Sequence, residues 1–114
     1  MVDPEGQHLS GYNTTVLDGA TAHAEINALQ KIKQLDYDRP DELMLITTCE
    51  PCPMCMSAII WAAVGEVIYG CDIPTAAKYG NQINIRAQEV AAESWYAPII
   101  HGGILAKECE ELFK

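Results

Sequence analysis

Residues 48–55 read Thr48-Cys49-Glu50-Pro51-Cys52-Pro53-Met54-Cys55, and they decide the fold class because they join a strand to a helix. The run over 43–48 is apolar with polar ends, which predicts a short strand. Proline is favoured in the first turn of a helix, so the two prolines of the segment predict a helix over 51–64. Gly65 is expected to end that helix.

The remaining elements alternate in type along the chain. Strands are expected at 8–12, 66–71 and 98–101, helices at 21–34, 87–94 and 104–113, and turns at 4–6 and 13–20. Thr21 is the expected N-cap of the first helix, while 72–86 has no clear period. Strands that alternate with helices favour an α/β architecture with a largely parallel sheet. Nothing divides the chain, so 1–114 is expected to form one domain.

Charge and cysteine content narrow the function classes. The 7 Lys and Arg against 16 Asp and Glu give a net charge of -9, which disfavours a nucleic-acid partner because little positive charge faces the phosphates. The longest apolar run, 58–64, is far shorter than the roughly 20 residues of a membrane helix, so no membrane partner is expected. An odd number of cysteines, 5 in all, favours a reducing, cytoplasmic location in which clustered thiols bind metal.

Two segments at predicted helix starts carry candidate metal ligands. His23, Cys52 and Cys55 supply the nitrogen and sulfur ligands of a catalytic zinc site, which keeps a fourth position open for water. Glu25 follows His23 by two residues, and at the beginning of a helix both side chains can reach a site beyond the helix end. Glu25 is therefore expected to contact the zinc-bound water and act as the base, beside one zinc ion per chain.

The patterns His23-Ala24-Glu25 and Pro51-Cys52-Pro53-Met54-Cys55 resemble the signature of the zinc-dependent cytidine deaminase-like superfamily. The stretches 21–29, 49–62, 67–70 and 103–110 resemble the branch that contains guanine deaminases, cytosine and nucleoside deaminases, and tRNA adenosine deaminases. The resemblance implies a three-layer α/β/α fold with a mixed, mostly parallel sheet. By the same resemblance the chain is N-terminally shortened, lacking a helix and most of a first strand.

The resemblance also implies an activity, which is hydrolytic removal of an exocyclic amine as ammonia. Glu25 would move the protons, Asn13 would hold the base through its amide, and Trp61 would line the base pocket. A guanine-type purine is the first expected substrate, and cytosine, cytidine or adenosine come next. A homodimer is expected, because a missing first strand would leave an unpaired sheet edge.

Several alternatives stay open at this point. Cys49 could join His23, Cys52 and Cys55 in a closed structural zinc site. Trp61 could be a core residue, and Asn13 could simply form a turn. A tRNA adenosine-to-inosine deaminase is one alternative function, although 85–114 holds three basic against five acidic side chains. An inactive, zinc-holding scaffold subunit is the other.

Overall fold

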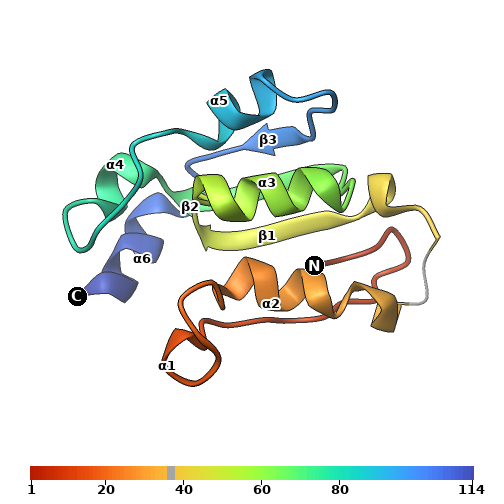
Figure 1. The fold of residues 1–114 in the computed structure, drawn as a ribbon, viewed down its shortest axis with the longest axis horizontal. Coiled ribbons are helices and arrows are strands. Elements are labelled where there is room, and N and C mark those ends of the chain that lie inside the picture. The colour runs from red at the N-terminus through yellow and green to blue at the C-terminus, as the bar shows by residue number, and fades with distance from the viewer. Residues whose placement is uncertain (36–37) are drawn as a thin grey trace.

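The computed structural model describes residues 1–35 and 38–114, which form an α/β structure around a parallel sheet (Figure 1). The strands are β1 (Met44–Cys49), β2 (Glu66–Cys71) and β3 (Ile99–His101). The helices are α1 (Thr15–Asp18), α2 (Ala24–Gln30), α3 (Pro53–Trp61), α4 (Ile73–Ala76), α5 (Ala87–Ala92) and α6 (Ala106–Glu110), with short 3-10 turns η1 (Ile32–Leu35), η2 (Pro40–Glu42) and η3 (Glu111–Phe113). The predicted α/β class is confirmed.

The sheet has β2 between β1 and β3, and both pairings are parallel. The register places Leu45 opposite Val67 and Val67 opposite Ile100. Leu45 and Val67 are buried, as expected for a parallel sheet covered on both faces. Among the described residues, the antiparallel contacts are isolated bridges of Val2 to His8 and to Met44.

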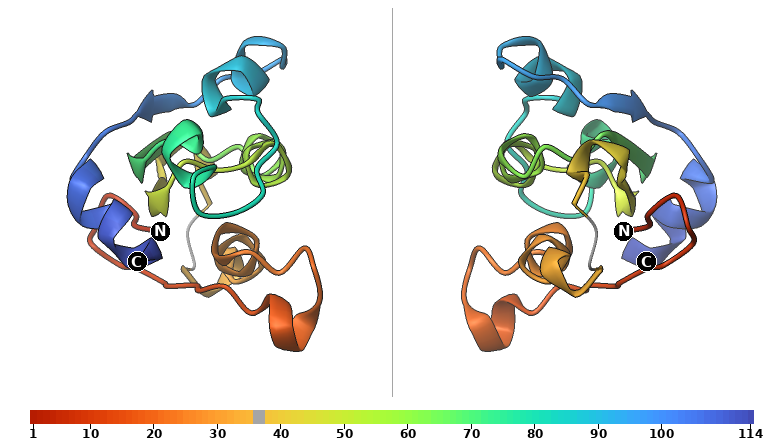
Figure 2. Two further views of the ribbon diagram at one scale, coloured as in Figure 1. Left: turned by 90° about the vertical axis from the view of Figure 1, so that its left-hand side faces the viewer. Right: turned by 90° about the vertical axis from the view of Figure 1, so that its right-hand side faces the viewer.

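Helices cover the two faces of this sheet unequally. Figure 2 shows α2, α3 and α5 on one side and α6 on the other. α3 contributes Met56, Ile59 and Ile60 to the buried core, so packing on the sheet fixes its position. The amino ends of α2 and α3 lie at the edge where β1 and β2 end (Figure 1). Residues from four elements can therefore meet at that edge.

The helix predicted over 21–34 is shorter in the structure, since α2 spans Ala24–Gln30 and η1 follows it. His23, not Thr21, is its N-cap, with an extended backbone. The cause is a turn that holds Ala22, whose N–H donates to Gly19 O at 3.0 Å and whose carbonyl accepts from Thr14 N at 3.0 Å. The turn moves the N-cap by two residues, from Thr21 to His23, and so places the candidate ligand at the beginning of the helix.

Other boundaries also differ from the predictions. The strand over 8–12 is wrong, because His8 forms only an isolated bridge. The helix over 104–113 divides into α6 and η3, and its N-cap Leu105 has a left-handed φ of 55°. The turn-rich stretch at 13–20 contains α1, and the stretch without a period contains α4. The strands over 66–71 and 98–101 and the helix over 87–94 are confirmed to within two residues.

α3 ends before the residue expected to stop it. Its last helical residue is Trp61, and Ala63 has a φ of 61°. Gly65 has a different role, because a Cβ at this position would collide with the carbonyl oxygen of Asp41. The glycine allows the loop into β2 to pass close to η2.

Candidate functional site

The first arm of the site is the beginning of α2. His23 is the N-cap, with φ of -69° and ψ of 159°, and Glu25 lies in the first turn. Side chains at a helix start lean back toward the N-terminus, so both reach beyond the helix end. The two residues therefore lie at a helix start, where the His-x-Glu spacing predicts that both side chains can reach one site. The predicted N-cap, Thr21, was two residues too early.

The second arm is the beginning of α3. Cys52 is its N-cap and Pro53 its first residue, as the two prolines predict, because proline fixes a helical φ and needs no hydrogen-bond acceptor there. Cys55 is the third helical residue and is 0% exposed. The Cys-x-x-Cys spacing thereby directs both sulfur atoms toward the same end of the helix.

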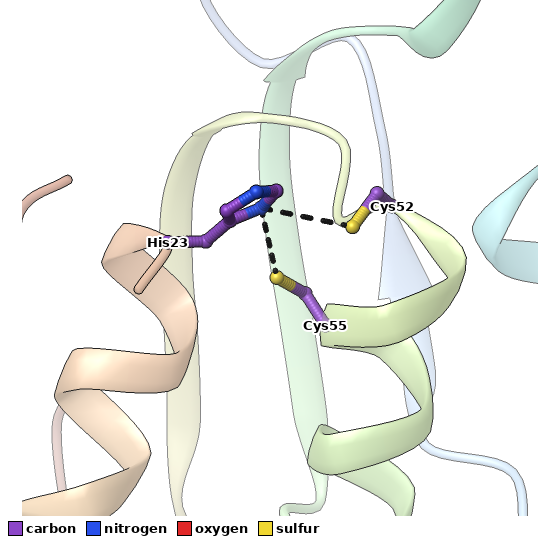
Figure 3. Close-up of side chains that lie close together, drawn as sticks. All are labelled: His23, Cys52 and Cys55. Atoms are coloured by element: carbon purple, nitrogen blue, oxygen red, sulfur yellow. Dashed lines mark hydrogen bonds between the residues drawn. The ribbon is translucent and has the colours of Figure 1, made fainter. Parts of the chain in front are cut away.

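The two arms meet, as Figure 3 shows. His23 Nδ1 lies 3.7 Å from Cys52 Sγ and 3.5 Å from Cys55 Sγ, and the three ligand atoms lie within 4.8 Å of one another. Tetrahedral zinc with its usual bond lengths of about 2.3 Å to sulfur and 2.0 Å to nitrogen places these atoms about 3.6 Å apart. The three side chains therefore fit a zinc ion without rearrangement, and the predicted ligand set is the one that the structure brings together.

The two ligand thiols are coupled through a hydrogen bond. The bond from the Cys55 thiol lowers the pKa of Cys52 to about 5, and backbone N–H groups at the start of α3 act in the same direction. The same bond, together with burial, raises the pKa of Cys55. One thiolate is thus stabilised at neutral pH, while binding of a cation by both sulfurs would release the second proton.

Cys49 is not part of this ligand group among the described residues. It is paired in register with Cys71 across β1 and β2, and burial first, then the neighbouring thiol, raises its pKa to about 12. The closed structural site of three cysteines and one histidine is therefore not what the described residues form.

Glu25 lies beside the candidate ligands and is held from one side. Thr47 on β1 donates a hydrogen bond from Oγ1 to Glu25 Oε1 at 3.0 Å. The side chain also contacts Cys55, where it contributes to the raised pKa of that thiol. Glu25 is outside the set of metal-ligating atoms, so its carboxylate lies beside the candidate metal site without being one of its ligands.

A cavity of about 300 Å³ opens at this edge of the sheet. Its walls combine both arms with more distant segments: Asn13, His23, Ala24, Glu25, Thr48, Cys49, Glu50, Cys52, Gln82, Cys109, Leu112 and Phe113. Such a volume is at the lower end of the range for small-molecule sites. Gln82, Cys109, Leu112 and Phe113 were not predicted from the sequence. For Cys109, Leu112 and Phe113 the sequence offers one signal, which is their helical spacing. That spacing indicates a buried helix face but not a cavity wall.

Asn13 lines the same cavity from the loop before α1. Its Oδ1 accepts hydrogen bonds from the backbone N–H of Thr15 at 3.0 Å and its hydroxyl at 2.9 Å, so the turn-forming role is real. Asn27 fixes the loop by donating from Nδ2 to Tyr12 O at 2.7 Å and to Thr14 Oγ1 at 2.8 Å. The carbonyl of Asn13 is occupied, which leaves its amide N–H groups as the donors for a ligand.

Trp61 lies elsewhere. Its ring is 4.7 Å from that of Trp95, and the two residues are 76% and 68% exposed. They border a larger hollow of about 630 Å³ between α3 and α5, which contains none of the candidate metal ligands. Core packing of Trp61 is thus wrong, and within one chain the residue does not line the cavity at the metal ligands. We take the smaller cavity as the site because it alone of the two is lined by candidate metal ligands, His23 and Cys52.

Comparisons with known proteins agree with this geometry. Residues 1–71 match the family described as the cytidine and deoxycytidylate deaminase zinc-binding region. The match covers more than half of the 114 residues, so the chain belongs to that family. The zinc site and the deaminase-type fold predicted from the sequence are family properties of the chain.

The similar proteins include deaminases named for two kinds of substrate, guanine and tRNA adenosine. The chain is 43% identical over 77 residues to guanine deaminase of Bacillus subtilis, covering 67% of this chain and 47% of the relative, or about half its length. It is 29% identical over 106 residues to the tRNA-specific adenosine deaminase of Agrobacterium fabrum, covering 92% and 68%. A solved structure from a study of A-to-I editing by tRNA:A34 deaminases has a TM-score of 0.74 at 28% identity and covers 98% of this chain and 80% of its own.

None of the helices in the described residues is both long and apolar enough to cross a membrane.

Proposed function

We propose that the chain catalyses zinc-dependent hydrolytic deamination of a nucleobase or nucleoside, with a guanine-type purine as first substrate. The observation that carries the proposal is the convergence of His23, Cys52 and Cys55 beside Glu25, with His23, Cys52 and Glu25 lining one cavity. The three ligands leave one tetrahedral position open, as in catalytic zinc sites. The adjacent carboxylate would have no purpose in a closed structural site.

The residues divide the reaction between them. Zinc, when bound, lowers the pKa of a water molecule toward neutrality and so supplies the nucleophile. Glu25 would accept one proton of that water and deliver it to the ring nitrogen next to the reacting carbon. It would then accept the second proton from the hydroxyl on that carbon and pass it to the departing amine, which leaves as ammonia. Thr47 holds Oε1 of Glu25, and the carboxylate also contacts Cys55, so it is kept beside the ligands where these protons would be exchanged.

Substrate orientation is assigned to Asn13. Its amide N–H groups would donate to acceptor atoms on the edge of a base, because Thr15 already occupies its carbonyl oxygen. The role of Trp61 in substrate binding stays a prediction, since this residue borders the other hollow.

The preference for a small substrate rests on charge and similarity. The net charge of -9 disfavours a polynucleotide, and the relative with 43% identity is a guanine deaminase. The alternative is a tRNA adenosine-to-inosine deaminase, favoured by the 92% coverage of the Agrobacterium fabrum relative. A scaffold subunit without turnover is the third possibility.

One panel separates these functions. Ammonia release is measured with guanine, cytosine, adenine, their nucleosides and a tRNA anticodon hairpin, each with and without chelator. Guanine is expected to give the fastest release, and the chelator should abolish it. Fastest release from the hairpin would assign the tRNA function, and no release from any substrate by the zinc-loaded protein would assign the scaffold.

Glu25→Ala tests the mechanism in the same assay. The variant should lose about 100-fold or more in kcat, the usual contribution of a general acid and base, while it retains about one zinc per chain. Loss of zinc from this variant would mean that Glu25 is a ligand and that the assigned roles are wrong.

The assembly and location are also proposals. Trp61 and Trp95 are 76% and 68% exposed with their rings in contact, and an exposed apolar surface of this kind marks interaction sites, which supports the expected homodimer. Size measurement at micromolar concentration should give a dimer, and Trp95→Ser should weaken it.

The five cysteines are free, which supports a reducing compartment such as the cytoplasm.

A further inference from the structure

Glu50 is a buried carboxylate in the loop from β1 to α3, two residues before the candidate ligand Cys52. The residue is 3% exposed and its side chain 1%. A charge removed from water is unfavourable unless it is paired and hydrogen-bonded. The partners of this carboxylate therefore decide what its burial accomplishes.

Both oxygens of Glu50 accept two hydrogen bonds. Oε1 accepts from Ile73 N at 2.8 Å and from Arg86 Nε at 2.9 Å. Oε2 accepts from Ala87 N at 2.8 Å and from the same Arg86 Nε at 3.0 Å. Ile73 and Ala87 are the first residues of α4 and α5, where backbone N–H groups have no partner inside the helix. One side chain thus joins the starts of two helices.

The ion pair has an outer support on β2. Arg86 donates from Nη2 to Tyr69 Oη at 3.2 Å, and Tyr69 is 8% exposed. The Glu50 backbone N–H donates to Cys71 O at 2.8 Å. We call Glu50, Arg86 and Tyr69 the Glu50 clasp. The clasp attaches the loop before Cys52 to β2, α4 and α5 at once.

The chain has little freedom between the clasp and the ligand. Pro51 is fully buried and its ring fixes φ, and Pro53 begins α3. The position of Cys52 Sγ, 3.7 Å from His23 Nδ1, is therefore set by where Glu50 is held. We propose that Glu50 is a positioning residue which, through the Glu50 clasp, holds Cys52 in the geometry that zinc requires.

A purely structural role makes a different prediction. If the clasp contributed only to folding, any variant of equal stability loss would bind zinc equally well. If the clasp positions Cys52, zinc affinity falls beyond what lost stability explains, as is usual for groups that orient metal ligands. The inference rests on the proposed zinc site, so the wild-type protein must first be shown to bind zinc.

The experiment measures zinc affinity by competition with a chromophoric chelator and the absorption bands of the cobalt-substituted protein. The variants are Glu50→Gln, which keeps the shape and loses the charge, and the milder Arg86→Lys, which keeps the charge and loses the planar donor group. Val67→Ala is the control, because this residue is 0% exposed near the start of β2 and takes part in none of the hydrogen bonds of the clasp. Chemical denaturation measures the unfolding free energy of each variant, so that zinc affinities are compared between variants with similar losses of stability.

Glu50→Gln and Arg86→Lys should lower zinc affinity by about 10-fold or more and shift the cobalt bands, while Val67→Ala should leave both unchanged. Zinc affinities within twofold of the Val67→Ala control would overturn the inference, and Arg86→Lys keeps the test decisive if Glu50→Gln does not fold. Wild-type protein that does not bind zinc would instead overturn the proposed function. Zinc binding without turnover would leave the clasp intact and reject only the activity.

Discussion

Removal of one hydroxyl group on β1 tests how Glu25 is held. Thr47→Val deletes the donor 3.0 Å from Glu25 Oε1 but keeps the branched side chain that a strand prefers. A hydrogen bond to a charged group contributes about 1.5–3 kcal/mol. The lower value applies here, because the contact is only partly buried and the same hydroxyl lies 3.1 Å from Cys49 O, which competes for its hydrogen. If that energy maintains the reactive orientation, about 1.5 kcal/mol corresponds to roughly a tenfold fall in kcat.

The assay is ammonia release at saturating substrate, with zinc content and unfolding free energy measured on the same samples. Thr47→Ser keeps the hydroxyl and should retain most of the rate. Because Thr47 does not contact His23, Cys52 or Cys55 through a hydrogen bond in the described residues, zinc content should stay at one per chain. Wild-type kcat in Thr47→Val, or an equal loss in Thr47→Ser, would refute the positioning argument.

Three further variants test a candidate metal ligand, the packing of β2 against α6, and the N-cap of α4. Cys52→Ser should lose most bound zinc and, with it, the stability that metal binding adds, as measured by zinc content and thermal unfolding with and without chelator. Gly70→Ala should lower the unfolding free energy by about 1–3 kcal/mol, because its new Cβ would collide with Cys109 on α6, whereas Gly80→Ala has open space and should be neutral in urea denaturation. Hydrogen bonds at the start of α4 hold the pKa of Asp72 below its ordinary value, so its contribution is present above about pH 4 and is lost as the pH falls through the lowered pKa. Asp72→Ala should therefore cost about 1 kcal/mol at pH 7 and progressively less in more acidic urea titrations, while a cost that is constant with pH would contradict this account.

The ligand set could be predicted from the sequence because its information is local. The spacing of His23 and Glu25, and of Cys52 and Cys55, places each pair at a helix start, and the prolines mark one of these starts directly. The N-cap of α2 could not be predicted in the same way. It depends on hydrogen bonds from Ala22 to residues up to eight positions away, which no local pattern encodes.

The cavity walls and the clasp were missed for a related reason. Gln82 lies in a segment with neither helical nor strand periodicity, so its position is decided by the elements on either side. Glu50 looks like an ordinary solvated loop residue in the sequence, since its partners Ile73, Arg86 and Ala87 lie 23, 36 and 37 residues further along the chain. Burial of a carboxylate by such distant donors can be seen only once the chain has folded.

The end of β1 explains how two separate arms form one site. Thr47 contacts the carboxylate on α2, and three residues later Glu50 anchors the loop that carries Cys52 on α3. The two contacts have different partners, but both begin at the same strand end, which holds the Glu25 carboxylate through Thr47 and the loop before Cys52 through Glu50. Because packing against the sheet holds β1 and α3 in place, small errors at this strand end would reach both arms. We infer that the chemistry depends on the exact path of residues 47–52 more than on either helix alone.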